Sequence, residues 1–253
     1  MKFLKIVIYA ITYIVYPFSF LVPRTERKIA IGSFRDAFND NAKYLFIYLS
    51  QNVSKHVSVA WISKSRLTVG EIRKRGLSAY WIFSPMGIWY ALRSKYWFFN
   101  AYTSDIMWCL SGGACCINLW HGVGLKRIEF NITTGPLYRR YHKKDVLDAF
   151  MHPEVFKRPN YLLSSTPFQT AILSTAFRIS QSQCLEMGYP RDEILLCSDE
   201  LRTRHIDKYE NETTHRLIAQ MRKYSKVYIY MPTWRDSQRG LFAQNLDFVQ
   251  YLN

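Results

Sequence analysis

An alternation of short apolar segments with longer segments of helical spacing constrains this 253-residue chain more than any other feature. The apolar segments have the length and side-chain content of strands, and they lie at residues 28–34, 57–62, 79–83, 96–99, 115–119, 161–164 and 184–187. Strands that alternate with helices along a chain predict an α/β fold with a parallel sheet and helices on both of its faces.

Capping residues mark where three of the intervening helices begin. Asn39 or Asp40 can cap a helix whose apolar face lies over residues 42–49,. In the pairs Ser84-Pro85 and Thr166-Pro167, a hydroxyl side chain precedes a proline, which is favoured at the first position of a helix,. These signals place helices after the first, third and sixth predicted strands.

The predicted strand at residues 115–119 ends in a motif that favours an active site. Trp120, His121 and Gly122 follow the strand, and an amphipathic segment with Lys126 and Ile128 comes next. Crevices open at the carboxyl ends of parallel strands, and a helix that begins there turns free N–H groups toward an anion. His121 is therefore a candidate functional residue at a predicted strand–helix turn. Alternatively, it caps that turn and the glycines only permit it.

The chain is strongly basic, with 34 lysine and arginine residues against 19 aspartate and glutamate residues and a formal net charge of +15. Such a charge predicts an anionic partner, and nucleic acid, anionic lipid and phosphorylated substrates all satisfy that requirement. The basic residues are scattered, and they form no nucleic-acid-binding signature,. We therefore expect an anionic membrane surface and a phosphorylated substrate as partners, and no nucleic acid.

The five cysteines indicate a reducing compartment. Their number is odd, they form no C-x-x-C pair, and Cys115 and Cys116 lie in an apolar segment. Buried reduced thiols of a cytosolic protein explain this pattern better than disulfides or a metal site. Because no acidic cluster of the metal-ligand type stands near the motifs, we expect no protein metal site and no cofactor. The sequence leaves open whether the substrate carries a Mg²⁺ ion.

Residues 3–22 are nearly all apolar and predict a membrane-associated helix over residues 1–23. The run approaches the ~18–20 residues that a spanning helix needs, but Pro17 and Pro23 shorten it. It lacks a small-residue cleavage site, so no removable signal peptide is expected. Basic residues on both flanks set no orientation. We expect the helix to lie in or dip into the cytoplasmic face of the cell membrane, with a true span or a buried first helix as alternatives.

Four segments, in order along the chain, resemble one known family. Trp120-His121-Gly122 followed by Leu125-Lys126 resembles the signature W-H-G-T-P-L-K of the CDP-glycerol glycerophosphotransferases, the polymerases of teichoic-acid and capsule polyol phosphates. Three other segments are similar to the same family, namely Gly32-Ser33-Phe34 with Asp40-Asn41, Met187-Gly188-Tyr189-Pro190-Arg191, and the residues from Tyr230 to Asp236.

The resemblance implies a GT-B-like fold. Residues 28–220 would then form a Rossmann-like N-terminal lobe on the acceptor side. Residues 226–253, with a strand at 226–230 and a helix at 241–252, would form only the start of a C-terminal nucleotide-binding lobe, so the sequence resembles an N-terminal portion of such an enzyme. Two departures from the family pattern bear on the donor or acceptor rather than on the family: Val123-Gly124 stands where Thr-Pro is usual, and Asp192-Glu193 where Asn-Asp is common.

The resemblance also implies a reaction and a set of site residues. A polyol phosphate, glycerol phosphate or similar, passes from a CDP-polyol donor to a hydroxyl of a lipid-linked acceptor or of a growing teichoic-acid or capsule polymer, and CMP leaves. His121 is the expected general base, because histidine exchanges a proton near neutral pH. The expected substrate-binding residues are Gly122, Lys126, Gly188, Arg191, Thr233 and Arg235.

Alternatives to this interpretation stay open at the level of the sequence. Arg191 has a simpler explanation, which is a surface salt bridge with Asp192 or Glu193. The chain as a whole also has an alternative explanation, which is that it is an inactive, membrane-bound remnant or an interaction module. A basic nucleic-acid binder would explain the charge but not the motifs.

Overall fold

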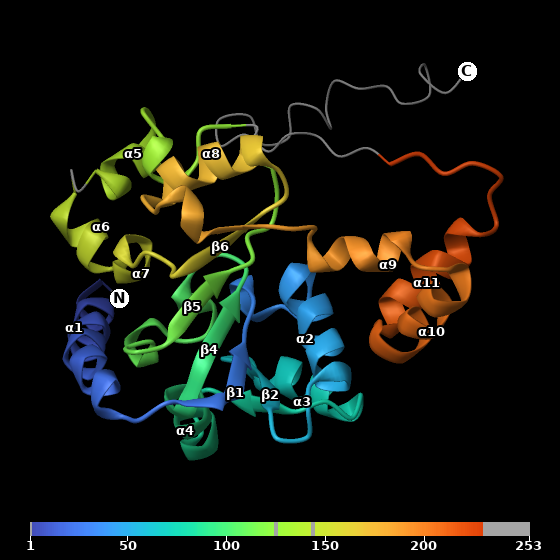
Figure 1. The fold of residues 1–253 in the computed structure, drawn as a ribbon, viewed down its shortest axis with the longest axis horizontal. Coiled ribbons are helices and arrows are strands. Elements are labelled where there is room, and N and C mark those ends of the chain that lie inside the picture. Colours follow the sequence, from blue (N-terminus) through green and yellow to red (C-terminus); the bar gives the residue numbers. More distant parts are fainter. Residues whose placement is uncertain (1, 124–125, 143–144, 230–253) are drawn as a thin grey trace. The chain divides into compact units, whose positions relative to one another are not determined.

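The computed structural model describes residues 2–123, 126–142 and 145–229 of the chain. The chain divides into two compact units, residues 1–204 and residues 205–253 (Figure 1). The first unit contains the sheet together with His121 and Arg191. The lobe boundaries predicted from the sequence, at residues 23, 28, 220 and 226, stay predictions.

A seven-stranded sheet forms the centre of the first unit, and every neighbouring pair of strands is parallel. The strands are β1 (Thr25–Ile31), β2 (Ser58–Ser63), β3 (Ala79–Trp81), β4 (Ser94–Phe99), β5 (Cys115–Asn118), β6 (Tyr161–Ser164) and β7 (Cys184–Glu186). Their spatial order is β3-β2-β1-β4-β5-β6-β7. The predicted α/β fold with a parallel sheet is therefore confirmed. The order reverses between β1 and β4, which is where such sheets open a crevice at the carboxyl ends of the strands.

Helices cover both faces of the sheet. The elements concerned are α2 (Asp40–Asn52), α3 (Arg66–Lys74), α4 (Pro85–Arg93), the 3₁₀ turn η4 (Trp108–Leu110) and α8 (Pro167–Phe177). On one face, α2 and α3 bury Phe46, Trp61 and Ile72 completely. On the other face, α4 and η4 pack around Trp97, and α8 continues this layer over β6 and β7.

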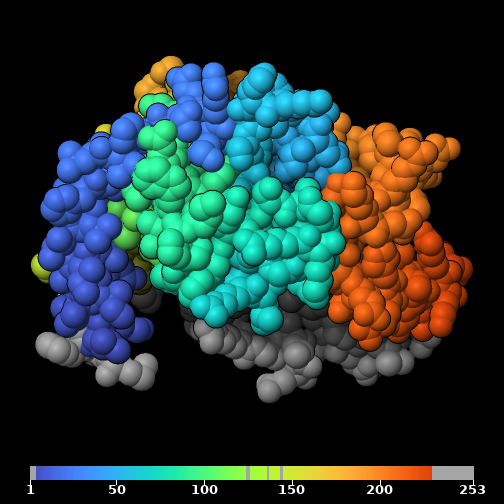
Figure 2. Space-filling view, turned by 90° about the horizontal axis from the view of Figure 1, so that it is seen from below, coloured from blue at the N-terminus to red at the C-terminus, as the bar shows by residue number. Residues whose placement is uncertain are grey.

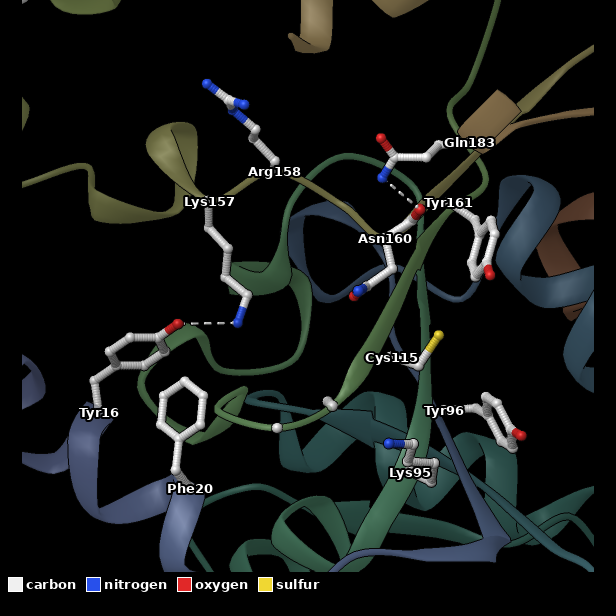
Figure 3. A pocket seen from close by; sticks show the side chains of 12 residues that line it. Tyr16, Phe20, Lys95, Tyr96, Cys115, Lys157, Arg158, Asn160, Tyr161 and Gln183 are labelled. Carbon is white, nitrogen blue, oxygen red and sulfur yellow. Dashed lines mark hydrogen bonds between the residues drawn. The ribbon is translucent and has the colours of Figure 1, made fainter. Parts of the chain in front are cut away.

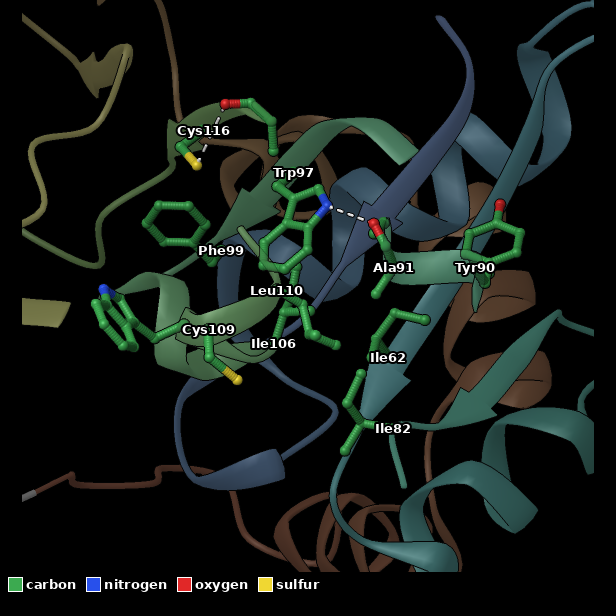
Figure 4. Packing of buried hydrophobic residues seen from close by; sticks show 14 residues of the cluster. Ile62, Ile82, Tyr90, Ala91, Trp97, Phe99, Ile106, Cys109, Leu110 and Cys116 are labelled. Carbon is green, nitrogen blue, oxygen red and sulfur yellow. Dashed lines mark hydrogen bonds between the residues drawn. The ribbon is translucent and has the colours of Figure 1, made fainter. Parts of the chain in front are cut away.

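Figure 4 shows the core of the second face. Trp97 lies among Phe99, Ile106 and Cys116, and its indole N–H donates to the carbonyl oxygen of Ala91 at 3.2 Å. An indole buried with its N–H satisfied adds a large apolar area without the cost of an unpaired donor. This layer therefore fixes β4, the strand that ends at the candidate site.

The three predicted helix starts are confirmed. Asn39 occupies the position before α2, although its side-chain oxygen accepts from the hydroxyl of Ser33 instead of from the helix. Ser84 and Thr166 each accept from the backbone N–H three residues on, at 3.0 and 3.1 Å. These bonds satisfy N–H groups that the start of a helix leaves without a partner.

The amino terminus forms α1 (Lys2–Phe18) and the 3₁₀ turn η1 (Ser19–Leu21). In Figure 2 this segment is the blue column along one side of the first unit. Its tyrosines face the protein: Tyr16 stacks on Trp108 with ring centroids 4.6 Å apart, and Tyr13 meets the same ring edge-on at 5.1 Å. Several of its other apolar side chains are exposed, namely the aliphatic Leu4, Val7, Ile8, Ile11 and Ile14 and the aromatic Phe18. By length and composition the window Leu4–Leu21 could cross a membrane.

Arg24 ties the end of this segment to the sheet. Its guanidinium donates to four backbone carbonyl groups at 2.6–3.0 Å, those of Ala91, Ser94, Leu110 and Gly112. Burial withholds water from the guanidinium and lowers its pKa to about 10,. The N-terminal segment is thus an integral part of the first unit as well as a surface element.

The structure contradicts two of the predicted elements. The helix predicted directly after His121 does not form in the described residues, since residues 126–128 are not helical and the next element is the 3₁₀ turn η5 (Glu129–Asn131). Glu129 has φ +50°, which a continuing α-helix does not allow,. Residues 226–229 form no strand and are exposed, and no described strand pairs with them. Tyr230 and the helix predicted at 241–252 lie outside the described residues.

Several other helices lie in the described part of the chain. They are α5 (Pro136–Tyr141), α6 (Val146–Phe150), α7 (Pro153–Phe156), α9 (Glu193–Leu196), α10 (Asp199–Tyr209) and α11 (Glu212–Met221). The first four are too short to show a helical period in the sequence. The two longer helices are mostly exposed: Tyr209 is the only buried residue of α10, and α11 has no buried residue.

Candidate active site at the carboxyl edge of the sheet

Loops that follow four strands meet at the carboxyl edge of the sheet. Ser33 follows β1, Asn100 follows β4, His121 follows β5, and Arg191 lies shortly beyond β7. Hydrogen bonds join these loops to one another. Because β1 and β4 flank the reversal of strand order, the meeting point is the one that the topology favours for a ligand.

Asn100 is the hub of this edge. Its side-chain oxygen accepts from the N–H of Ala42 in α2 at 3.0 Å, and its amide group donates to the hydroxyl of Ser33 at 2.8 Å. Its backbone carbonyl oxygen lies 3.2 Å from Nδ1 of His121. Asn100 is buried, so its bonds to Ala42 and Ser33 form away from water and hold these partners firmly, and its bond to His121 is partly buried,. One residue therefore sets the positions of β1, α2 and the His121 ring.

The bond to Asn100 decides which nitrogen of His121 carries the proton. A carbonyl oxygen can only accept, so Nδ1 must be the donor, and in the neutral ring the lone pair then lies on Nε2,. The side chain is exposed at the surface of this edge. His121 is thus held in the tautomer that lets Nε2 take a proton from a molecule bound outside.

Trp120 turns the chain so that His121 faces outward. Its backbone has φ +53°, a left-handed conformation that costs a residue other than glycine about 1–3 kcal/mol,. Hydrogen bonds hold it there: its N–H donates to the side chain of Asn118, and its carbonyl accepts from Asn41, both at 2.8 Å. The indole is buried and lies 4.1 Å from the His121 ring. The strain is local to the residue that aims the histidine.

Arg191 connects two of the family-like segments to the histidine. Its Nη1 donates to the Asp40 carboxylate at 2.7 Å and to the backbone carbonyl of His121 at 3.0 Å. The salt bridge suggested by the sequence involves Asp192, whose carboxylate lies 3.9 Å from Nε of Arg191 and interacts only weakly. Arg191 therefore pairs mainly with Asp40, about 150 residues away in the chain.

The carbonyl of Gly122 is held from the other side. It accepts from the Gln169 amide at 2.9 Å and from the Tyr189 hydroxyl at 3.2 Å. Gln169 is buried, and its oxygen accepts from both the N–H and the hydroxyl of Ser165. Burial raises the pKa of Tyr189, so this hydroxyl remains a donor at neutral pH. The loop after His121 is thus fixed by α8 and by the segment after β7.

A buried carboxyl group supports the end of β4 from beneath. Asp105 accepts from the N–H groups of Asn100 and Ala101 at 3.1 and 2.9 Å. Burial raises its pKa to about 6, and the hydrogen bonds reduce the shift. The Asp105 carbonyl also packs against Gly32, where an added Cβ would lie 2.7 Å from the carbonyl oxygen. Only glycine lets β1 approach this support so closely.

The remaining predicted site residues have weaker structural support. Lys126 is exposed on the segment that leads from His121 to η5. Gly188 is also exposed, and a Cβ added at Gly188 or at Gly122 would meet no atom within 4 Å. Thr233 and Arg235 lie outside the described residues. The structure therefore brings His121, Gly122 and Arg191 together.

The sequence interpretation missed the residues that hold the site together. Asn100 and Asn118 are buried amides at the ends of β4 and β5, and Gln169 is a buried amide near the start of α8. The sequence did mark Asn100 and Asn118 as candidates, because each is a polar residue that ends an apolar run in a predicted parallel sheet. For Gln169 the sequence offered no such signal. Among the described residues, no group of three or more His, Cys, Asp or Glu side chains could hold a metal ion.

Comparison with known proteins gives matches over nearly the whole chain. Residues 14–252 match the model of the family described as CDP-Glycerol:Poly(glycerophosphate) glycerophosphotransferase. A teichoic acid glycerol-phosphate transferase of Staphylococcus aureus is 31% identical over 159 residues, which are 62% of this chain and 38% of that protein. A teichoic acid poly(glycerol phosphate) polymerase of Bacillus spizizenii is 26% identical over 248 residues, 89% of this chain and 55% of that protein.

Solved structures support the same relationship at the level of the fold. The structure of the wall teichoic acid polymerase TagF aligns with a TM-score of 0.59 at 22% identity, over 94% of this chain and 57% of that one. A variant of TagF described with CDPG aligns with a TM-score of 0.61 at 20% identity over the same shares. The seven-stranded parallel sheet thus matches a part of this GT-B-like enzyme, and the chain spans about half the length of such relatives. On the match that covers residues 14–252, the chain belongs to the CDP-glycerol:poly(glycerophosphate) glycerophosphotransferase family.

Proposed function

We propose that this chain acts in the transfer of a polyol phosphate, glycerol phosphate or similar, from a CDP-polyol to a hydroxyl group, with release of CMP. The acceptor is a lipid-linked primer or a growing teichoic-acid or capsule polymer. The observation that carries this proposal is the exposed His121 ring, whose Nδ1 donates to the Asn100 carbonyl at the carboxyl edge of the sheet. Membership of the family supports the class of donor.

In the proposed step, Nε2 of His121 takes the proton of the acceptor hydroxyl while the hydroxyl oxygen attacks the β-phosphorus of the donor. The bond from that phosphorus to the bridging oxygen breaks, and CMP leaves with the electron pair. A fixed tautomer aids this step because the base needs no reorientation before it accepts the proton. Asn100 and Trp120 supply that fixation through the bond to Nδ1 and the ring contact.

The phosphate charge requires cations near the histidine. Arg191 is the best placed of the proposed residues, since both of its short bonds use Nη1, and no described group accepts from Nη2. A guanidinium held by Asp40 in this way is oriented before a phosphate arrives. Lys126, Gly122 and Gly188 are proposed for the same site on the family-like segments. Thr233 and Arg235 are proposed on those segments alone.

We also propose that the protein lies at the cytoplasmic face of the cell membrane. The exposed aliphatic side chains of α1 form an apolar surface next to a basic protein, and soluble monomers rarely expose a patch of this kind,. The Tyr13 and Tyr16 contacts to Trp108 favour a helix that lies along the protein in the membrane interface over one that spans the bilayer alone.

Two measurements test the proposed activity. Calorimetric titration of the 253-residue chain with CDP-glycerol measures donor binding directly. A chimera in which residues 1–253 replace the matching portion of a teichoic acid polymerase measures transfer of labelled glycerol phosphate to a membrane acceptor. We expect the chimera to transfer the label. A folded chimera without transfer, together with a chain that does not bind the donor, would instead support the inactive, membrane-bound remnant.

A further inference from the structure

An open cavity of about 850 Å³ lies at the opposite edge of the sheet from His121, where β4, β5 and β6 begin. It is bounded by the end of α1 on one side and by the segment before β6 on the other. Figure 3 shows that aromatic and basic side chains line it, among them Tyr16, Phe20, Lys95, Lys157, Arg158 and Tyr161. Among the described residues proposed for phosphate transfer, none lines this cavity.

The cavity is cationic. Lys95, Lys157 and Arg158 all line it, and no carboxylate is found among the described residues of its wall. The ammonium groups of Lys157 and Lys95 reach into it from opposite sides in Figure 3. A concave wall with three positive charges and no counter-charge favours an anion, because it focuses the positive potential where water is partly excluded.

Lys157 and Tyr16 together place a hydrogen-bond donor in this cationic cavity. Nζ of Lys157 donates to Oγ and to the carbonyl of Ser111 at 2.8 and 3.0 Å, and to the hydroxyl oxygen of Tyr16 at 3.2 Å. The Tyr16 oxygen thus acts as the acceptor in that bond, which leaves its own O–H to donate. An ammonium held by three bonds together with a phenolic O–H presents one charge and one donor to an oxyanion.

The apolar surface of α1 runs up to the same cavity. Phe20 lines the cavity and is 57% exposed, and the neighbouring Phe18 and Leu21 are more exposed still. From there the exposed aliphatic residues continue along the helix to Leu4. A ligand with an anionic head and long apolar chains would satisfy both surfaces at once, whereas a free anion would use only the cavity.

We propose that this cavity binds the phosphate headgroup of an anionic membrane phospholipid while the exposed face of α1 inserts among the acyl chains. The headgroup phosphate accepts from Tyr16 and lies between the charges of Lys95 and Lys157, with Arg158 at the rim. The membrane therefore contacts the protein at the amino edge of the sheet, and the proposed reaction takes place at the other edge. The site is independent of polyol-phosphate transfer and is tested without any CDP-polyol.

The test is sedimentation of the full chain with vesicles of phosphatidylcholine, with and without phosphatidylglycerol. We expect the double variant Lys95→Ala/Arg158→Ala to lower affinity for phosphatidylglycerol vesicles by about 25-fold, which is about fivefold for each charge near the surface. The matched control Lys74→Ala/Arg127→Ala removes the same charge from exposed positions outside the cavity and should lower it far less. Equal losses in the two variants would overturn the proposal, because binding would then follow total charge alone.

A second variant separates the headgroup contact from charge and from folding. Tyr16→Phe keeps the net charge and the stacking on Trp108 but removes the O–H donor. We expect weaker binding to phosphatidylglycerol vesicles with an unchanged melting temperature, and vesicle binding equal to that of the parent chain would contradict the contact. Excess inorganic phosphate distinguishes a free-anion site. If phosphate alone raises the melting temperature as much as short-chain phosphatidylglycerol does, the lipid assignment is wrong.

Discussion

The two edges of the sheet are built in opposite ways. At the carboxyl edge, Asn100, Trp120 and Arg191 are bonded to the loops around them, so that His121 has a fixed position and tautomer. At the amino edge, Lys95 and Arg158 line an open cavity beside α1. The two arrangements suit the two different roles proposed for them. A base needs bonded neighbours that hold it still, whereas an amphiphile needs space, charge and an apolar surface.

Parallel strands make this separation possible. Every strand of the sheet begins at one edge and ends at the other, so residues that precede the strands and residues that follow them form two distinct surfaces. A substitution at one edge should then leave the function of the other edge unchanged. Substitutions at either edge, each compared with a matched control, therefore test this separation.

Arg24→Met should cause the largest loss of stability. The substitution takes a charged donor away from four backbone carbonyl groups, and we expect the free energy of unfolding to fall by about 3–4 kcal/mol,. Arg27→Met, at an exposed position in β1, the strand that begins right after Arg24, is the control and should change it by about 0.5 kcal/mol or less,. Urea denaturation measures both. Similar losses in the two variants would show that the four bonds do not tie the amino-terminal segment to the sheet.

Asp105 should give the carboxyl edge a pH dependence. Its pKa is raised from 3.8 to about 6, so between these values the folded protein binds this proton more tightly than the unfolded chain does. Stability contributed by this group is therefore present below about pH 4 and is lost as the pH rises to about 6, by about 3 kcal/mol in total. Asp105→Asn keeps an oxygen for the N–H groups of Asn100 and Ala101 and should remove this dependence.

Urea denaturation between pH 4 and pH 7 checks the Asp105 prediction. The exposed Asp207→Asn variant should keep the pH dependence of the parent protein. A parent protein whose stability does not fall over this range, or an Asp105→Asn variant with an undiminished fall, would show that Asp105 ionises in the folded protein as it does in water.

His121→Ala should lower transfer by at least ~10²-fold, which is about 2.7 kcal/mol and the lower end for loss of a general base. Affinity for the CDP-polyol should change little, because in the proposed step the ring acts on the acceptor hydroxyl. His56→Ala, at an exposed position before β2, is the control on the amino side of the sheet. The chimeric transferase provides the assay. Near-normal transfer by His121→Ala would remove this residue as the base.

Gly32→Ala should disturb the carboxyl edge through packing alone. An added methyl group would lie 2.7 Å from both the Asp105 carbonyl oxygen and Cγ1 of Ile106, so we expect a loss of about 2 kcal/mol,. Gly70→Ala in α3 meets no atom within 4 Å and should instead gain up to about 1 kcal/mol from helix propensity,. Chemical denaturation compares the two. A Gly32→Ala protein as stable as the parent would disprove the close approach of β1 to Asp105.

The Asp40–Arg191 pair should show the smallest effect. Both side chains are partly exposed, and a double-mutant cycle with Asp40→Asn and Arg191→Gln should give a coupling of about 1 kcal/mol in unfolding free energy,. The corresponding cycle with Asp192→Asn should give a coupling near zero, because that carboxylate lies 3.9 Å from Nε. A larger coupling to Asp192 than to Asp40 would reverse the assignment of the partner of Arg191.

The local elements and the kind of fold can be predicted from the amino-acid sequence alone. The alternation of apolar and amphipathic segments was enough for the α/β class, and Asn39, Ser84 and Thr166 marked the helices that begin after them. It also placed His121 directly after a buried strand. These features depend on near neighbours in the chain, through side-chain period, capping bonds and the fixed φ of proline, so they can be read without knowing the partners in space.

The order of the strands and the surroundings of His121 depend instead on contacts between distant parts of the chain. The strand sequences are similarly apolar, so many orders satisfy the same pattern, and the one that forms depends on pairing and packing over long distances,. The bonds of His121 and Arg191 join residues 21 and about 150 positions apart. Packing also explains two features that the sequence did not predict. The helix expected after His121 does not form, because packing overrides local helix propensity. The cavity beside α1 is the space that the packed side chains leave unfilled.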